Sequence, residues 1–248
     1  MIDNKRLILD ICNISIRAGN KILEYYKDDI EVTHKSDSSP LTKADLASNK
    51  IIKTALHNLD TTIPILSEES LVDWNTRKSW NKYWLVDPLD GTKEFIKKNG
   101  EFTVNIALIK KNLPYIGIVY CPTFQTLYWN DPKSGSYKKH IDKIVKLEKR
   151  KKINFKDPNL RVVTSRSHMN KETEDFMTKL KKPEIVAVGS SLKILFVGRK
   201  VIFVPVKKSL LIFFELPIIF SALLTTPFSN SILCIFPSLL ISKTRLSD

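Results

Sequence analysis

Two amphipathic helices are predicted near the start of the chain. The first covers residues 5–27, where apolar side chains recur at helical spacing. Those side chains are Leu7, Ile11, Ile14, Ala18 and Ile22. The second begins at about Lys43, carries Asp45 in its first turn, and has an apolar side formed by Leu46, Ile51, Ala55 and Leu59. Between the helices, the polar segment 33–42 contains Ser38-Ser39-Pro40 and is expected to be a loop.

A series of short apolar runs predicts β-strands after these helices. The runs are residues 63–67, 83–86, 102–109, 114–121, 126–129, 161–164 and 185–188. Gly189 ends the last run, and Ser190-Ser191 is expected to cap a helix that begins there. Helices and strands in this order predict a layered α/β or α+β fold.

The composition is that of a globular chain with one domain or two small ones. The 248 residues are 43% hydrophobic and 27% charged, which argues against wholesale disorder. Cys12, Cys121 and Cys234 are far apart, so a reducing compartment is favoured over a disulfide scaffold. No Cys/His cluster has zinc-site spacing. The first residues lack an apolar run, so we expect no signal peptide and a cytoplasmic location.

The chain is strongly basic, with 40 Lys and Arg against 26 Asp and Glu and a net charge of +14. Much of the excess lies in residues 133–156, which include Lys149-Arg150-Lys151-Lys152. A solvated loop or hairpin, a patch for polynucleotides or anionic lipids, and a surface that steers an anionic small substrate all fit this charge. Because no stacking aromatics are interleaved, we expect no nucleic-acid partner.

The informative residues are acidic. Ser67-Glu68-Glu69 ends one predicted strand, and Asp87-Pro88-Leu89-Asp90-Gly91-Thr92 ends another. Alone, the second segment is equally typical of a capped turn. Neighbouring strands would bring both segments together, and converging carboxylates repel unless a cation lies between them. Oxygen ligands without His or Cys favour Mg²⁺, and Pro88 and Gly91 would let the Leu89 carbonyl face it.

These segments resemble the signature of the inositol monophosphatase superfamily, whose members are lithium-sensitive and magnesium-dependent. The match lies in residues 66–69 and 84–96. Other segments resemble the CysQ branch, the 3′(2′),5′-bisphosphate nucleotidases, more closely than they resemble inositol phosphatases. They are residues 93–96, 99–108, 164–168 and 189–193. The resemblance covers residues 5–193 and implies an inositol monophosphatase-like α/β sandwich.

The resemblance also implies a role for each matched residue. Glu68, Asp87 and Asp90 would bind metal through their side chains, and Leu89 through its carbonyl. Asp45 and Thr92 would orient and activate the attacking water. The substrate would be lined by Glu68, Leu89, Asp90, Gly91, Thr92, Gly189, Ser190 and Ser191. Arg166 and His168 fall nearby, where an exposed arginine and a core-capping histidine are the ordinary alternatives. Two or more Mg²⁺ ions and lithium sensitivity are expected.

The implied activity is hydrolysis of the 3′-phosphate of adenosine 3′,5′-bisphosphate to AMP and phosphate. Metal-assisted attack of water on a phosphate monoester fits the acidic motif and needs no nucleophilic Ser or Cys. An inositol or sugar monophosphatase is the enzymatic alternative. A non-catalytic, membrane-associated pseudo-enzyme is an alternative of another class, and a nucleic-acid-binding module is a third.

The family pattern breaks after Lys193. Relatives continue to a Trp-Asp pair that adds a metal ligand, whereas the last tryptophan here is Trp129. We therefore expect an incomplete catalytic domain in residues 1–193, a C-terminal part that is missing or replaced, and weak or no activity. The apolar tail, residues 194–248, is interpreted as the product of a changed reading frame. The competing interpretation is a membrane-active tail on the cytoplasmic face of the inner membrane, although three prolines break its uncharged stretch.

Overall fold

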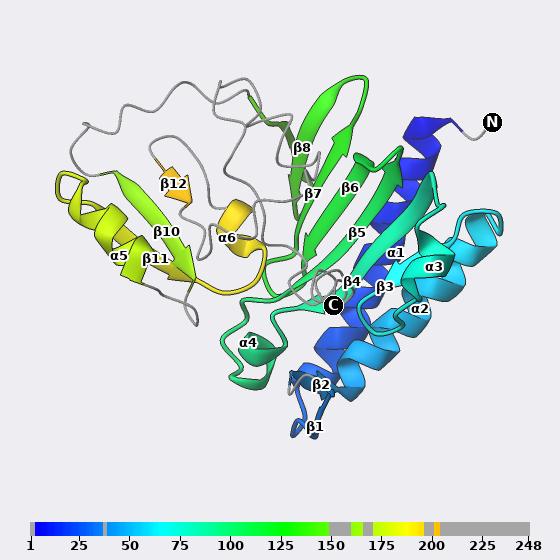
Figure 1. Ribbon diagram of the computed structural model, residues 1–248, viewed down its shortest axis with the longest axis horizontal. Helices are drawn as coiled ribbons and strands as arrows, with labels where there is room; N and C mark the ends of the chain where they lie inside the picture. Colours follow the sequence, from blue (N-terminus) through cyan, green and yellow to red (C-terminus); the bar gives the residue numbers. More distant parts are fainter. Residues whose placement is uncertain (1–2, 37–38, 149–159, 166–170, 196–200, 204–248) are drawn as a thin grey trace.

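The computed structural model describes residues 3–36, 39–148, 160–165, 171–195 and 201–203. A large mixed sheet is covered on one face by α1 (Asn4–Tyr26) and α2 (Lys43–Leu59), and a smaller sheet lies beside its other face (Figure 1). This is the layered α/β arrangement that the sequence predicts.

The two long helices confirm the predicted elements, with one correction to α2. In α1 the residues Ile11, Ala18 and Ile22 are fully buried, as their spacing predicts. In α2 the buried apolar residues include Ile52 and Leu56, whereas Leu46 is 49% exposed, so the predicted apolar side was wrong at that position. The inward positions of the first turns are instead polar, because Asp45, Ser48 and Asn49 are buried there.

Seven strands form the large sheet, in the spatial order β3-β4-β5-β6-β7-β8-β9. They are β3 (Ile65–Ser67), β4 (Lys82–Asp90), β5 (Thr103–Lys110), β6 (Leu113–Cys121), β7 (Thr126–Asp131), β8 (Gly135–His140) and β9 (Lys143–Lys146). β3 and β4 run parallel, and the other neighbours are antiparallel. Alternate side chains of the central strands face the helices, as Trp84 and Ile106 do, or pack in a second cluster, as Leu85 and Ala107 do.

A β-hairpin replaces the loop predicted for residues 33–42. It consists of β1 (Val32–His34) and β2 (Pro40–Thr42), which pair antiparallel. The short helices α3 (Trp74–Arg77) and α4 (Thr92–Ile96) were also missed. In the basic segment, β8 and β9 form a hairpin, which agrees with the interpretation of that segment as a solvated loop or hairpin.

The smaller sheet is parallel, in the order β11-β10-β12. It contains β10 (Arg161–Ser165), β11 (Glu184–Val188) and β12 (Val201–Phe203), with α5 (Lys171–Thr178) and α6 (Leu192–Leu195). The Leu192 N–H donates to Ser190 Oγ at 3.2 Å, which confirms the predicted cap. Cys121 of the large sheet packs with Val163 and Val188, so the two sheets share a small core.

Several expectations concern residues outside the described part of the chain. They include Arg166, His168, Lys149-Arg150-Lys151-Lys152 and nearly all of the tail, residues 194–248, with its two interpretations. Because β12 pairs with β10, the parallel sheet extends beyond residue 193, and the division proposed there stays a prediction. Across the described residues, no helix combines the length and apolar character that a bilayer span requires.

Candidate metal and active site

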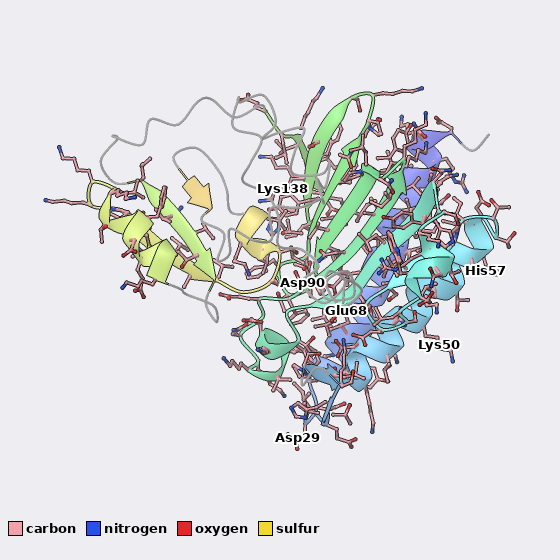
Figure 2. The ribbon with its side chains drawn as sticks, in the orientation of Figure 1. Asp29, Lys50, His57, Glu68, Asp90 and Lys138 are labelled. Carbon is pink, nitrogen blue, oxygen red and sulfur yellow. The ribbon has the colours of Figure 1, made fainter. Side chains whose placement is uncertain are left out.

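The two acidic segments meet at one end of the large sheet. β3 and β4 are parallel neighbours in which Ser67 is in register with Val86. The Glu68 N–H donates to the Val86 carbonyl at 3.1 Å, so Glu68 leaves β3 beside Asp87. Figure 2 labels Glu68 and Asp90 close together, and the charges of both act on Asp87. The strands thus gather the three carboxylates that the sequence singled out.

The backbone between Asp87 and Asp90 is irregular. β4 continues to Asp90, beyond the predicted end at Val86, but its register with β5 shifts between Asp87 and Asp90. The Pro88 carbonyl accepts a hydrogen bond from Ser48 Oγ at 2.7 Å, which ties the irregular segment to α2. Gly91 follows with φ of +96°, and a Cβ there would lie 2.9 Å from the Glu101 carbonyl, so this turn requires glycine.

Asp45 and Thr92 form a second unit of the site. The Asp45 carboxylate is buried because Oδ2 completes the capping box of α2, where it accepts the Thr42 N–H at 2.8 Å. Its other oxygen, Oδ1, faces Thr92 Oγ1 at 3.1 Å, although the two residues are 47 positions apart. Thr92 Oγ1 also lies 3.3 Å from the Leu89 carbonyl. A hydroxyl backed by a buried carboxylate is a reasonable path for a proton from water.

The surroundings of the Asp87 carboxylate are those expected of a metal ligand. Its Oδ1 is buried and has no hydrogen-bond partner within the described residues. Burial, together with the charges of Glu68 and Asp90, raises the pKa of Asp87 well above its usual range. A divalent cation among these carboxylates would supply the missing partner and offset the repulsion. In the described part of the chain, no group of three or more Asp, Glu, His or Cys side chains is already placed to hold a metal ion.

A lysine provides the positive charge in this arrangement. Lys35 Nζ, from the β1–β2 hairpin, lies 2.9 Å from Glu68 Oε1 and 2.6 Å from Glu69 Oε1. Burial lowers the pKa of Lys35, but its contacts with the two glutamates outweigh this effect and raise it. Sequence reasoning missed Lys35, because the contact spans 33 residues and starts in a segment that was interpreted as a loop.

Replacing Lys35 with methionine is expected to tighten Mg²⁺ binding by about tenfold. The ammonium group competes with a divalent cation for Glu68, and a charge pair near a protein surface is worth roughly 1–4 kcal/mol. Titration calorimetry of Mg²⁺ into metal-free protein measures the change. Lys50→Met is the control, since Lys50 is exposed on α2 and points away from Glu68 in Figure 2. Unchanged or weaker binding by Lys35→Met would contradict this expectation.

The metal-free protein is expected to lose stability as pH rises from 5 to 8. Burial, offset in part by Lys35, raises the pKa of Glu69 from its usual 4.5 to about 7. The folded state therefore binds more protons than the unfolded state between these values, and stability falls as pH rises through this window. Burial also raises the pKa of Asp45, Asp87 and Asp90, which acts in the same direction.

Thermal unfolding in EDTA at several pH values tests this expectation. The melting temperature should fall toward pH 8, and Mg²⁺ should raise it most at pH 8, where more of the carboxylates are ionised. Carboxylates whose pKa is lowered, such as those of Asp60 and Asp131, titrate below this window. A melting temperature that rises steadily from pH 5 to 8 in EDTA would contradict the arrangement.

The turn before α6 reaches the same carboxylates. The Ser191 N–H donates to Asp90 Oδ2, and the Gly189 N–H donates to Glu101 Oε2 at 2.7 Å. A Cβ on Gly189 would lie 2.3 Å from Glu94 Cγ, so the approach requires glycine. Burial raises the pKa of Asp90, although the positive charge of Lys193 acts against it. The turn that contains Gly189, Ser190 and Ser191 therefore lies beside Asp90 and Gly91, and its role in binding substrate stays a prediction.

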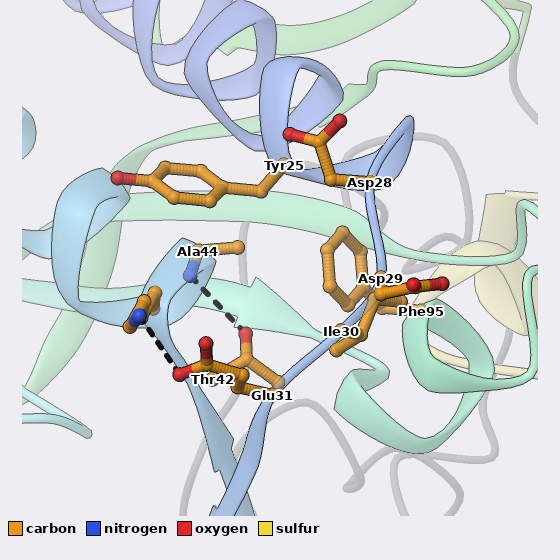
Figure 3. A pocket seen from close by; sticks show the side chains of 9 residues that line it. Tyr25, Asp28, Asp29, Ile30, Glu31, Thr42, Ala44 and Phe95 are labelled. Carbon is orange, nitrogen blue, oxygen red and sulfur yellow. Dashed lines mark hydrogen bonds and ion pairs between the residues drawn. The ribbon is translucent and has the colours of Figure 1, made fainter.

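The cavity in Figure 3 lies apart from these carboxylates. Its volume is about 240 Å³. It is lined by Tyr25, Asp28, Asp29, Ile30, Glu31, Thr42, Lys43, Ala44 and Phe95. Lys43 pairs with Glu31 at 2.8 Å in this lining, and none of the site residues named from the sequence lines the cavity. The carboxylate cluster, rather than this cavity, is therefore the candidate site.

Comparison with known proteins agrees with the geometry. The model of the inositol monophosphatase family matches residues 4–202. The 3′(2′),5′-bisphosphate nucleotidase CysQ of Buchnera aphidicola is 41% identical over 199 residues, which cover 76% of this chain and 70% of that protein. The crystal structure of CysQ from Bacteroides thetaiotaomicron is 36% identical with a TM-score of 0.62, and the match covers 77% of this chain and 76% of that one.

A more distant structure shares the fold. The IMPase/NADP phosphatase complexed with Mg²⁺ and phosphate has a TM-score of 0.66 at 18% identity, and the match covers 79% of this chain and 72% of that one. At this identity the likeness concerns the fold alone.

Proposed function

This chain belongs to the inositol monophosphatase family, and on that premise we propose that it is a magnesium-dependent 3′(2′),5′-bisphosphate nucleotidase. Its reaction is hydrolysis of adenosine 3′,5′-bisphosphate at the 3′-phosphate, with AMP and phosphate as products. Relatives that are about 40% identical to this chain are named 3′(2′),5′-bisphosphate nucleotidases, and their alignments cover about three quarters of this chain. The observation that carries the proposal is Asp87 Oδ1, which is buried among converging carboxylates and has no hydrogen-bond partner in the part of the chain that the structure describes.

The metal would be held by Glu68, Asp87 and Asp90 through their carboxylates, and by Leu89 through its carbonyl. Bound Mg²⁺ supplies two effects, a lower pKa for water and neutralisation of charge on the phosphate oxygens. Two or more ions and inhibition by lithium are part of the proposal. The donors are oxygens only, which suits Mg²⁺ better than zinc.

Asp45 and Thr92 move the proton. The Thr92 hydroxyl donates its hydrogen to Asp45 Oδ1, which leaves its oxygen to accept a proton from the attacking water. Burial raises the pKa of Asp45 despite its hydrogen bonds to Thr42, and this makes its carboxylate a stronger proton acceptor. The buried position of Asp45, fixed by the capping box, holds this pair in one geometry.

The substrate is enclosed from two sides. Residues 89–92, with Glu68, face the phosphate that is removed. Gly189, Ser190 and Ser191 approach from the smaller sheet and contact the rest of the molecule. The hydrogen bond from Ser191 N–H to Asp90 keeps this turn against the metal ligands. An anionic nucleotide also suits a chain whose net charge is +14.

Phosphate release from adenosine 3′,5′-bisphosphate by the purified full chain tests the function. We expect Mg²⁺-dependent release that EDTA abolishes and lithium inhibits. Inositol monophosphate and a sugar monophosphate are assayed in parallel, and faster release from either would favour the alternative phosphatase. Hydrolysis of none of these substrates would contradict the proposal and favour a non-catalytic protein.

The same assay tests the predicted impairment. With no Trp-Asp pair after Trp129, this chain is expected to turn over more slowly than the Buchnera relative measured beside it. Equal rates would contradict the impairment.

We place the reaction in the cytoplasm, where the buried thiols of Cys12 and Cys121 would stay reduced. Peripheral contact with the inner membrane stays a prediction, tested by membrane fractionation.

A further inference from the structure

We propose that Asn105 is a positioning residue that holds Asp90 ready for the metal and couples it to the turn before α6. The inference rests on the proposed function, because it assigns Asp90 to the metal. Asn105 was not singled out from the sequence as a site residue. It lies on β5 in register with Asp87, and only 2% of it is exposed.

The Asn105 side chain bridges two residues of the site. Its Nδ2 donates to Asp90 Oδ2 at 3.4 Å, and its Oδ1 accepts from Ser191 Oγ at 3.2 Å. Ser191 Oγ also lies 2.6 Å from Thr103 Oγ1, in a contact where either hydroxyl can donate. All four side chains come together although Ser191 is 86 positions from Asn105.

One arrangement of hydrogens satisfies this chain of contacts. The Ser191 hydroxyl donates to Asn105 Oδ1, so its oxygen accepts from Thr103. Because the amide oxygen is taken by Ser191, the amide nitrogen faces Asp90 and can only donate. The order Thr103 to Ser191 to Asn105 to Asp90 therefore has a fixed direction, which a carboxylate or an apolar side chain at position 105 would break.

The consequence for Asp90 is a fixed carboxylate orientation. In this order Asn105 Nδ2 and the Ser191 N–H both donate to Asp90 Oδ2, and neither contact uses Oδ1. Oδ1 is thereby held for a cation. Partners that orient a metal ligand in this way typically contribute 10–100-fold to metal affinity. Ser191 lies in the turn between β11 and α6, so the same contacts link this turn to the proposed metal ligand.

Asn105→Leu removes the bridge while keeping a side chain of similar size. We expect Mn²⁺ affinity, measured from the free-ion signal by electron paramagnetic resonance on the full chain without substrate, to fall by about tenfold. Asn130→Leu is the matched control. Asn130 is also 2% exposed and lies on β7 of the same sheet. Its side chain accepts from the Gly117 N–H and donates to the Tyr115 carbonyl, away from Asp90 in sequence and in the sheet. It should destabilise the fold similarly and leave Mn²⁺ affinity unchanged.

A second variant covers the case in which Asn105→Leu fails to fold. Thr103→Val is nearly isosteric and removes only the hydroxyl that begins the chain; we expect Mn²⁺ affinity to fall severalfold. Wild-type affinity in Asn105→Leu, or in Thr103→Val when the former is unfolded, overturns the positioning role. An equal loss in Asn130→Leu overturns it too. After either of these outcomes, the proposed function still holds if the wild-type chain hydrolyses the bisphosphonucleotide. A wild-type chain that binds no Mn²⁺ would contradict both the positioning role of Asn105 and the proposed function.

Discussion

Asp87→Asn is expected to abolish hydrolysis while making the metal-free protein more stable. Asp87 is fully buried, and burial together with Glu68 and Asp90 raises its pKa. Asparagine resembles the protonated acid, so the substitution removes a repulsion that protonation or a bound cation otherwise relieves. Loss of a metal ligand removes several kcal/mol of transition-state stabilisation, or about a thousandfold in kcat. Phosphate release and thermal unfolding in EDTA measure the two effects, and the melting temperature should rise by about 3 °C.

The control for Asp87→Asn is Asp142→Asn, which changes net charge equally at an exposed hairpin position. It should leave both kcat and the melting temperature unchanged. If Asp87→Asn were active, Asp87 would not bind the metal. If the variant were inactive but less stable than wild type in EDTA, the carboxylates would not repel one another in the metal-free protein.

Thr92→Val is expected to lower kcat by roughly 10²–10⁴-fold and to leave Mn²⁺ affinity unchanged. Valine has nearly the same shape as threonine but cannot pass a proton to Asp45 Oδ1, which lies 3.1 Å from the hydroxyl. The carboxylates that hold the metal are untouched by the change. Rates at saturating substrate and Mg²⁺, with Mn²⁺ binding by electron paramagnetic resonance, separate the two properties.

Thr92→Ser provides the matched rescue, because it keeps the hydroxyl and loses only a methyl group. It should retain activity within about tenfold of wild type. Equal loss in Val and Ser variants would point to packing of the methyl group rather than proton transfer. Weaker Mn²⁺ binding by Thr92→Val would instead place Thr92 among the groups that position the metal.

The large helices and the acidic segments were predictable because their signals are local. Ile11, Ala18 and Ile22 share one face of α1 through spacing alone. Glu68 and Asp87 follow apolar runs that become neighbouring strands, so their convergence follows from a short stretch of chain. The Asp45–Thr92 pair came from a family resemblance rather than from spacing, since 47 residues separate them.

The missed features depend on contacts that distant residues supply. The helical spacing predicted that Leu46 faces the core, but it is exposed. The inward positions at the start of α2 are occupied by polar residues of the site. The hairpin that carries Lys35 has strands of only three residues each, joined by a polar segment, which is too short for a clear alternating pattern. The contacts of Lys35 with Glu68 and Glu69 tie it to the site. Asn105 meets Ser191 only after both sheets have formed.

The strand that ends the large sheet bears on how the molecule behaves at high concentration. β9 is the last strand in the spatial order, and its apolar residues Ile144 and Val145 are exposed. Among the described residues no further strand pairs with β9, and an edge strand of this kind is a site where strands of other molecules can add. Lys143 and Lys146 flank the two apolar residues, and their mutual repulsion between molecules opposes such growth. We therefore expect part of the excess positive charge to keep the protein dispersed, independently of any role in catalysis.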